Sequence, residues 1–126
     1  LGVRLQTPTV VLGFVEDMPD LMRAADLAVG KAGPGAIAEA LATGVPLVLT
    51  SYLPGQERSN VRFVVDSGVG RYAPSPRRLL EAASELLGGD RSVHRAMAHR
   101  AGELAHPRAA LDIASACLGL AAATPK

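Results

Sequence analysis

The chain has 126 residues, the size of about one domain, and its 13 basic and 12 acidic side chains give a net charge of +1. This balance argues against a dedicated nucleic-acid surface, and no run approaches the ~20 apolar residues of a membrane span. Aromatic side chains make up 3% of the residues, so Ala, Val, Leu and Ile must build the core. The single Cys117 excludes an internal disulfide and fits a reducing, cytoplasmic compartment.

The first residues lack the basic and then apolar pattern of a signal peptide. Residue 1 is Leu rather than Met. We therefore expect this chain to be a piece of a longer protein.

Short apolar runs and helical patterns alternate along the chain. Strands are predicted over residues 9–14, 27–30, 47–50 and 71–73, and helices over about 17–25, 35–43, 60–66, 75–87, 92–105 and 109–123. Continuous apolar strands between helices predict a parallel sheet covered on both faces, in one domain over 1–126 with a helical C-terminal part over 75–126. Four strands make a small sheet, so one or two strands are expected to be missing on the N-terminal side. In the last helix, Cys117 and four apolar residues are expected to pack in a core: Leu111, Ile113, Leu118 and Leu120.

Residues 31–39, Lys-Ala-Gly-Pro-Gly-Ala-Ile-Ala-Glu, are the most informative segment of the sequence. They join a predicted strand to a predicted helix through a glycine turn, a layout that points backbone N–H groups and the helix dipole at a phosphate. Glu39 lies four residues after Gly35, so it shares the helix face of Gly35 and leans towards the turn. There its carboxylate could accept hydrogen bonds from ribose hydroxyls. A solvated Glu on the exposed side of the helix is the alternative.

Other phosphate motifs fit the segment less well. Gly33-x-Gly35-x-x-Ala38 matches the dinucleotide fingerprint, but the next strand ends in Thr50-Ser51 without the acid that a NAD site needs. Pro34 also removes one N–H from the turn. No Gly-Lys-Ser/Thr sequence follows, which excludes a Walker loop.

Further polar residues have both a functional and an ordinary interpretation. Lys31 ends its strand near the expected diphosphate, and it either neutralises a leaving group or points to solvent. Gln56 and Glu57 follow a strand on a Pro-Gly turn, at the end of the sheet where ligands of α/β proteins bind, or they form the polar start of a helix. The histidines lack the spacing of a helix-borne metal pair, so no metal site is predicted.

A set of motifs in one order resembles a known family. The motifs are Phe14-Val-Glu-Asp-Met18, the segment 31–39, Gly44-x-Pro46, Pro54-Gly-Gln-Glu57 with Asn60, and Gly68-x-Gly70. Together, over about residues 10–73, they resemble the C-terminal, donor-binding domain of family-28 glycosyltransferases. That family includes the bacterial N-acetylglucosaminyltransferase that completes lipid II and the diacylglycerol galactosyl- and glucosyltransferases. The sequences of residues 31–35 and 54–57 are most similar to the monogalactosyldiacylglycerol synthase branch.

The resemblance implies a role for each matching position. Phe14, Val15 and Met18 match the region that binds uracil. Lys31, Gly33, Pro34, Gly35 and Ala36 match the turn that faces the diphosphate. Glu39 matches the ribose-binding carboxylate, and Gln56 and Glu57 match the polar pair that holds donor-sugar hydroxyls. Asn60 matches a polar residue just after that pair and is grouped with it at the donor sugar.

The resemblance also implies a fold and an activity. The fold is α/β, a Rossmann-like parallel sheet between two helix layers, forming the C-terminal half of a two-Rossmann (GT-B) glycosyltransferase. The expected activity is transfer of a hexose from a UDP-sugar to an acceptor, of diacylglycerol-like or polyprenyl-linked lipid, without metal or other cofactor. The general base and the acceptor site are expected in an N-terminal domain outside this chain, which would also contact the inner face of the membrane. The isolated chain should then bind a UDP-sugar and transfer nothing.

Two other functions stay open at this point. UDP-N-acetylglucosamine 2-epimerases share the fold, but they are expected to carry catalytic acids that the sequence does not reveal. A non-catalytic nucleotide-binding or interaction domain is the second alternative.

Overall fold

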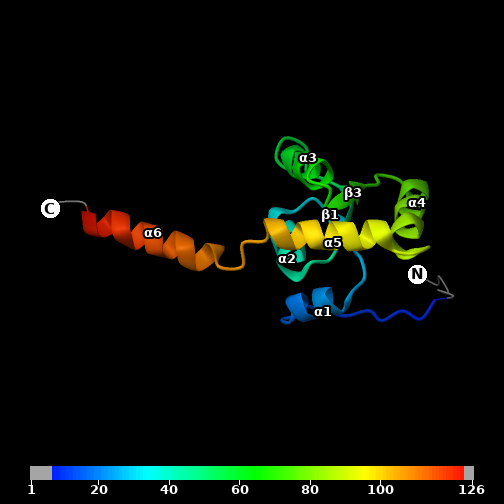
Figure 1. Cartoon of the computed structure of the whole chain (residues 1–126), viewed down its shortest axis with the longest axis horizontal. Helices are drawn as coiled ribbons and strands as arrows, with labels where there is room; N and C mark the ends of the chain where they lie inside the picture. The colour runs from blue at the N-terminus through cyan, green and yellow to red at the C-terminus, as the bar shows by residue number, and fades with distance from the viewer. Residues whose placement is uncertain (1–6, 124–126) are drawn as a thin grey trace.

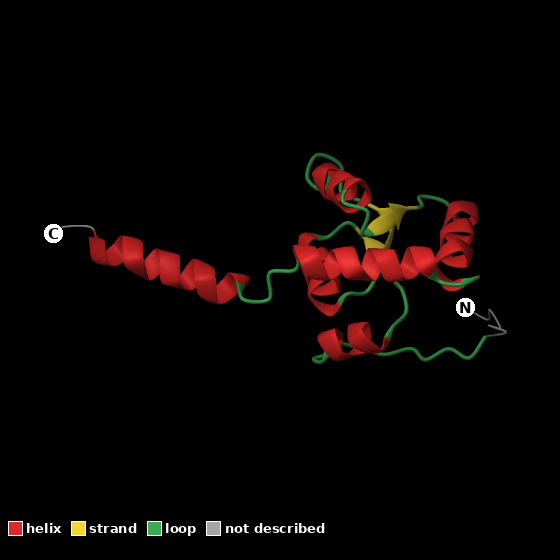
Figure 2. Cartoon of the chain, in the orientation of Figure 1, coloured by secondary structure: helices red, strands yellow, loops and turns green. Residues whose placement is uncertain are grey.

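The computed structural model describes residues 7–123, which contain one sheet of three parallel strands in the order β1-β2-β3. The strands are β1 (Ala28–Lys31), β2 (Leu47–Ser51) and β3 (Gly70–Tyr72). The central strand is β2, whose Leu47 pairs with Ala28 on one side and with Gly70 on the other. Helices surround this short sheet (Figure 2).

The helices begin and end close to where the sequence predicts them. They are α1 (Met18–Ala24), α2 (Pro34–Thr43), α3 (Arg58–Asp66), α4 (Pro76–Leu87), α5 (Ser92–Leu104) and α6 (Ala109–Ala123). At the start of α4, the Ser75 hydroxyl accepts a hydrogen bond from the Arg78 N–H, which is an ordinary N-cap. Gly44 ends α2 at a φ of +74°, where a residue with a Cβ would be strained.

The two faces of β2 contribute to different core clusters, because successive side chains of a strand point to opposite sides. Leu47 and Leu49 belong to a core cluster that includes residues of α2 and α3. Val48 belongs to a second cluster with Leu86 of α4 and Met97 of α5. Figure 1 shows α5 running across the sheet. Both faces of the sheet are thus covered, which confirms the predicted α/β, Rossmann-like layers.

The strand predicted over residues 9–14 is wrong. These residues have no regular structure, and Val11 and Phe14 are 90% and 96% exposed. A strand is stabilised by hydrogen bonds to a neighbouring strand, and within residues 7–123 β1 pairs only with β2. With no pairing strand, this apolar run forms no strand, and the sheet of the described residues has three strands instead of four.

The predicted packing of the last helix is also wrong. The helix itself forms, but α6 extends away from the rest of the molecule after the turn near Pro107 (Figure 1). Its apolar residues are therefore exposed: Leu111, Ile113, Leu118 and Leu120. Cys117, expected in a core, is exposed as well. Among the described helices, none combines the length and hydropathy needed to cross a bilayer.

Candidate functional site

The turn between β1 and α2 presents unpaired backbone N–H groups. Gly33 is the N-cap of α2, and Pro34 at the first helical position has no N–H to offer. The Ile37 N–H already bonds to the Gly33 carbonyl at 3.1 Å. The N–H groups of Gly35 and Ala36 lie in the first turn, where an α-helix supplies no partner. This exposed end of a ten-residue helix is suited to bind an anion.

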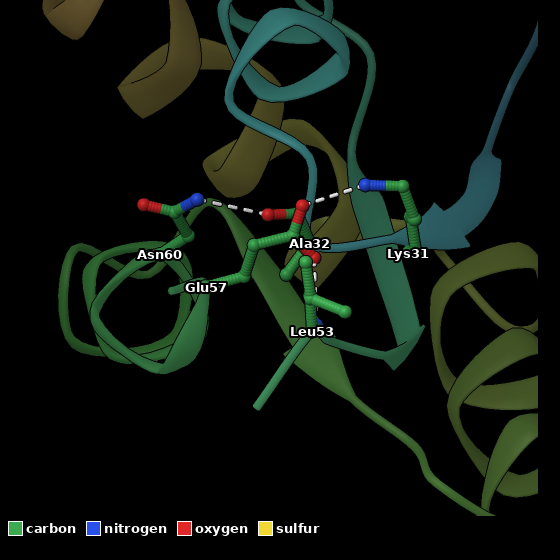
Figure 3. A network of polar contacts seen from close by, with 5 residues as sticks. All are labelled: Lys31, Ala32, Leu53, Glu57 and Asn60. Atoms are coloured by element: carbon green, nitrogen blue, oxygen red, sulfur yellow. Dashed lines mark hydrogen bonds and ion pairs between the residues drawn. The ribbon is translucent and has the colours of Figure 1, made fainter. Parts of the chain in front are cut away.

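Lys31, the last residue of β1, lies over the same turn. Its Nζ is 2.6 Å from Oε1 of Glu57, which comes from the loop between β2 and α3 (Figure 3). A Cβ added to Gly33 would lie 3.2 Å from this Nζ, so the ammonium rests directly against the glycine. The turn therefore combines N–H donors with one positive side chain.

Glu57 is held on both carboxylate oxygens. Oε1 accepts from Lys31, and Oε2 accepts a hydrogen bond of 2.8 Å from the Leu53 N–H. The hydrogen bond from Lys31, together with that from Leu53, lowers the pKa of Glu57 below its usual value of 4.5, although partial desolvation acts in the opposite direction. Glu57 is thus a carboxylate at neutral pH.

Asn60 forms a second link between the same two segments. Its Nδ2 donates a hydrogen bond of 2.9 Å to the Ala32 carbonyl, just after β1 (Figure 3). The side-chain oxygen of Asn60 stays available to a ligand, because the amide uses only its nitrogen in this contact. The turn after β1 and the first turn of α3 are in this way joined by two side chains.

Glu39 lies on an exposed part of α2, one turn after Gly35. Residues four apart in a helix are neighbours on one face, so this carboxylate lies on the side of the turn. Glu39 is exposed, and its ribose-binding role stays a prediction.

Other predicted residues are not joined to this cluster. Gln56 is exposed on the loop before α3. Phe14, Val15 and Met18 lie before or at the start of α1, and Phe14 is almost fully exposed. The uracil-binding role of these three residues stays a prediction.

Sequence reasoning missed two backbone groups, the Leu53 N–H and the Ala32 carbonyl. Each fixes a predicted side chain, Glu57 or Asn60, in place. No residue type marks such a role, since every non-proline residue carries the same N–H and C=O. The only available signal was position, since both segments follow parallel strands and so lie at the same edge of the sheet.

A parallel sheet with a glycine turn that opens a helix at its carboxyl edge is the arrangement of a Rossmann-like α/β domain. Residues 3–112 match the model of the glycosyltransferase family 28 C-terminal domain, and the chain belongs to this family. The resemblance seen in the sequence is thereby confirmed.

Individual relatives point to one branch of the family. The chain is 40% identical over 106 residues to monogalactosyldiacylglycerol synthase 3, chloroplastic, of Arabidopsis thaliana, a match that covers 84% of this chain and 23% of that protein. It is 42% identical over 106 residues to probable monogalactosyldiacylglycerol synthase 3, chloroplastic, of Oryza sativa subsp. japonica, covering 84% and 21%. It is 38% identical over 106 residues to the Spinacia oleracea synthase, covering 84% and 20%. The chain thus spans about a fifth of the length of these curated relatives.

Proposed function

We propose that the chain binds the UDP-sugar donor of a glycosyltransferase that transfers a hexose to a lipid acceptor. The observation that carries this proposal is the start of α2, where free N–H groups and the Lys31 ammonium lie together. Family membership supports it, and so do relatives whose names describe a galactosyl-diacylglycerol product.

The turn would bind the diphosphate. Gly35 and Ala36 would donate their N–H groups to phosphate oxygens, Pro34 would preset the helix start, and Gly33, which has no Cβ, would leave room for the Lys31 ammonium. As the bond to the sugar breaks, negative charge grows on the departing UDP. The α2 dipole and Lys31 would stabilise that charge.

The remaining parts of the donor would contact neighbouring residues. Glu39 would accept hydrogen bonds from ribose hydroxyls, and Gln56 and Asn60 would face the donor sugar, whereas the Glu57 carboxylate is buried and bonded to Lys31 and to the Leu53 N–H. The segment of Phe14, Val15 and Met18 would bind uracil. Amide and carboxylate groups suit this task because they make directional hydrogen bonds to hydroxyls.

The acceptor side is proposed to lie outside this chain. A general base and a lipid site in a preceding domain would complete the enzyme, with that domain contacting the membrane surface, and neither metal nor cofactor is proposed. A cytoplasmic location stays a prediction, and the chloroplast location in the relatives' names concerns those proteins. A UDP-sugar epimerase or a non-catalytic nucleotide-binding domain is less well supported, because the relatives are named as synthases.

Calorimetric titration of the chain with UDP and with 2′-deoxy-UDP tests the proposal. We expect the wild type to bind 2′-deoxy-UDP about tenfold more weakly than UDP, the effect of one hydrogen bond to a charged group. Glu39→Ala should bind both equally and weakly. Glu103→Ala, which removes an exposed carboxylate from α5, is the matched control and should bind like the wild type.

Three outcomes would contradict parts of the proposal. No binding of UDP by the wild type would favour an interaction domain. UDP binding that Glu39→Ala leaves unchanged would remove the ribose assignment. Conversion of UDP-N-acetylglucosamine to an epimerised product by the isolated chain would favour the epimerase.

A further inference from the structure

The ion pair between Lys31 and Glu57 joins two segments that are far apart in the sequence. Lys31 ends β1, and Glu57 precedes α3 in the loop after β2 (Figure 3). We infer that Glu57 is a positioning residue that holds the Lys31 ammonium over the glycine turn, ready for the diphosphate of the donor. This inference rests on the proposed function and gives Glu57 a task other than a contact with the sugar.

The position of the ammonium is the first argument. The Lys31 side chain is 64% exposed, and a lysine at a strand end ordinarily samples many rotamers. Here its Nζ is folded back to within 3.2 Å of the Cβ position of Gly33, over the start of α2. The contact that accounts for this position is the bond of 2.6 Å to Glu57.

The rigidity of the carboxylate is the second argument. The Glu57 side chain is only 8% exposed, and the Leu53 N–H holds its second oxygen. A carboxylate fixed in this way cannot follow a mobile lysine, so the lysine must adopt the position that the carboxylate sets. Asn60 adds to this rigidity, since its bond to the Ala32 carbonyl ties the turn to α3.

The donor capacity of Lys31 is the third argument. An ammonium has three N–H donors, and Glu57 uses one of them. Two donors are left for phosphate oxygens. The Glu57 side chain is only 8% exposed and each of its oxygens already accepts one hydrogen bond, so it is less open to a ligand than the Lys31 ammonium.

Titration of four proteins with three probes tests the inference: the wild type, Glu57→Gln, Lys31→Met and the double variant, each with UDP, UDP-galactose and inorganic pyrophosphate. Glutamine retains an oxygen for the Leu53 N–H, but it cannot form an ion pair with the ammonium. We expect Glu57→Gln to raise the Kd of all three probes by the same factor, about tenfold. In the Lys31→Met background, Glu57→Gln should have no further effect, because coupled residues are not additive.

Glu85→Gln is the matched control, because it breaks another ion pair, that with Arg71, away from the turn. It should bind every probe like the wild type. Urea unfolding of each variant shows whether the fold is retained.

The alternatives predict different patterns. If Glu57 contacts the sugar, Glu57→Gln weakens only the binding of UDP-galactose. If the carboxylate competes with phosphate for Lys31, Glu57→Gln binds pyrophosphate more tightly than the wild type. Either result, or independent effects of the two substitutions, overturns the inference. The pyrophosphate titration distinguishes failure of the inference from failure of the proposed function. If the wild type binds pyrophosphate but not UDP, only the nucleotide proposal is refuted. If the wild type and Glu57→Gln bind pyrophosphate equally, only the positioning role of Glu57 is refuted.

Discussion

Gly35→Ala should make the protein more stable and a weaker binder of UDP. Gly35 is the second residue of α2, and a Cβ added there meets nothing within 4 Å. Alanine loses less backbone freedom than glycine on entering a helix, so the free energy of unfolding should rise by about 0.5–1 kcal/mol. For a chain of 126 residues this corresponds to a rise in Tm of about 2–4 °C.

The same methyl group should interfere with the ligand. The space beside Gly35 is open in the structure, and it is the space that the proposed diphosphate would fill. We therefore expect the Kd for UDP to rise about tenfold or more, equivalent to at least about 1.4 kcal/mol of binding free energy.

Differential scanning calorimetry and UDP titration measure both effects on the same samples. The control is Gly102→Ala in α5, where an added Cβ likewise meets nothing within 4 Å. It should raise Tm by a similar amount and leave UDP binding unchanged. If Gly35→Ala binds UDP as tightly as Gly102→Ala does, the diphosphate does not lie against the start of α2.

Three further predictions concern the framework around the site. Gly70→Ala should lower the free energy of unfolding, measured in urea, by about 1–3 kcal/mol, since its Cβ would overlap the Leu47 carbonyl oxygen; a loss below about 1 kcal/mol would show that the sheet adapts. The hydrogen bond from Arg71 lowers the pKa of Glu85 in the folded protein. The pair therefore stabilises the fold at pH values above the pKa of Glu85 in the unfolded chain, and this stabilisation is lost as the pH falls through the pKa of Glu85 in the folded protein. Below pH ~4.5 the free energy of unfolding, measured in urea, should therefore drop more for the wild type than for Glu85→Gln, by less than about 1 kcal/mol for so exposed a pair. Equal drops would exclude the pair as a source of stability. Cys117 should react with a thiol reagent in the native protein as fast as in urea, and slow labelling would mean that α6 is covered in solution.

The local features of the site could be predicted from the sequence. Pro34 and the flanking glycines predict where α2 begins, and the spacing of four residues puts Glu39 on the face of Gly35. Lys31 and Glu57 each lie at or after the carboxyl end of a parallel strand, so the sequence also predicts that they lie at one edge of the sheet. These inferences succeed because they depend on backbone geometry and short-range periodicity, which the sequence carries residue by residue.

The sequence by itself determined the alternation of strands and helices, the glycine turn and the chemistry of its side chains. Only the tertiary structure decided which groups pair, such as Glu57 with Lys31 and with the Leu53 N–H, because those contacts join separate segments. It also decided that residues 9–14 and α6 are exposed, although both are apolar. Hydrophobicity states what a residue gains when it is buried, but burial requires a facing surface, and for these two segments the described residues provide none.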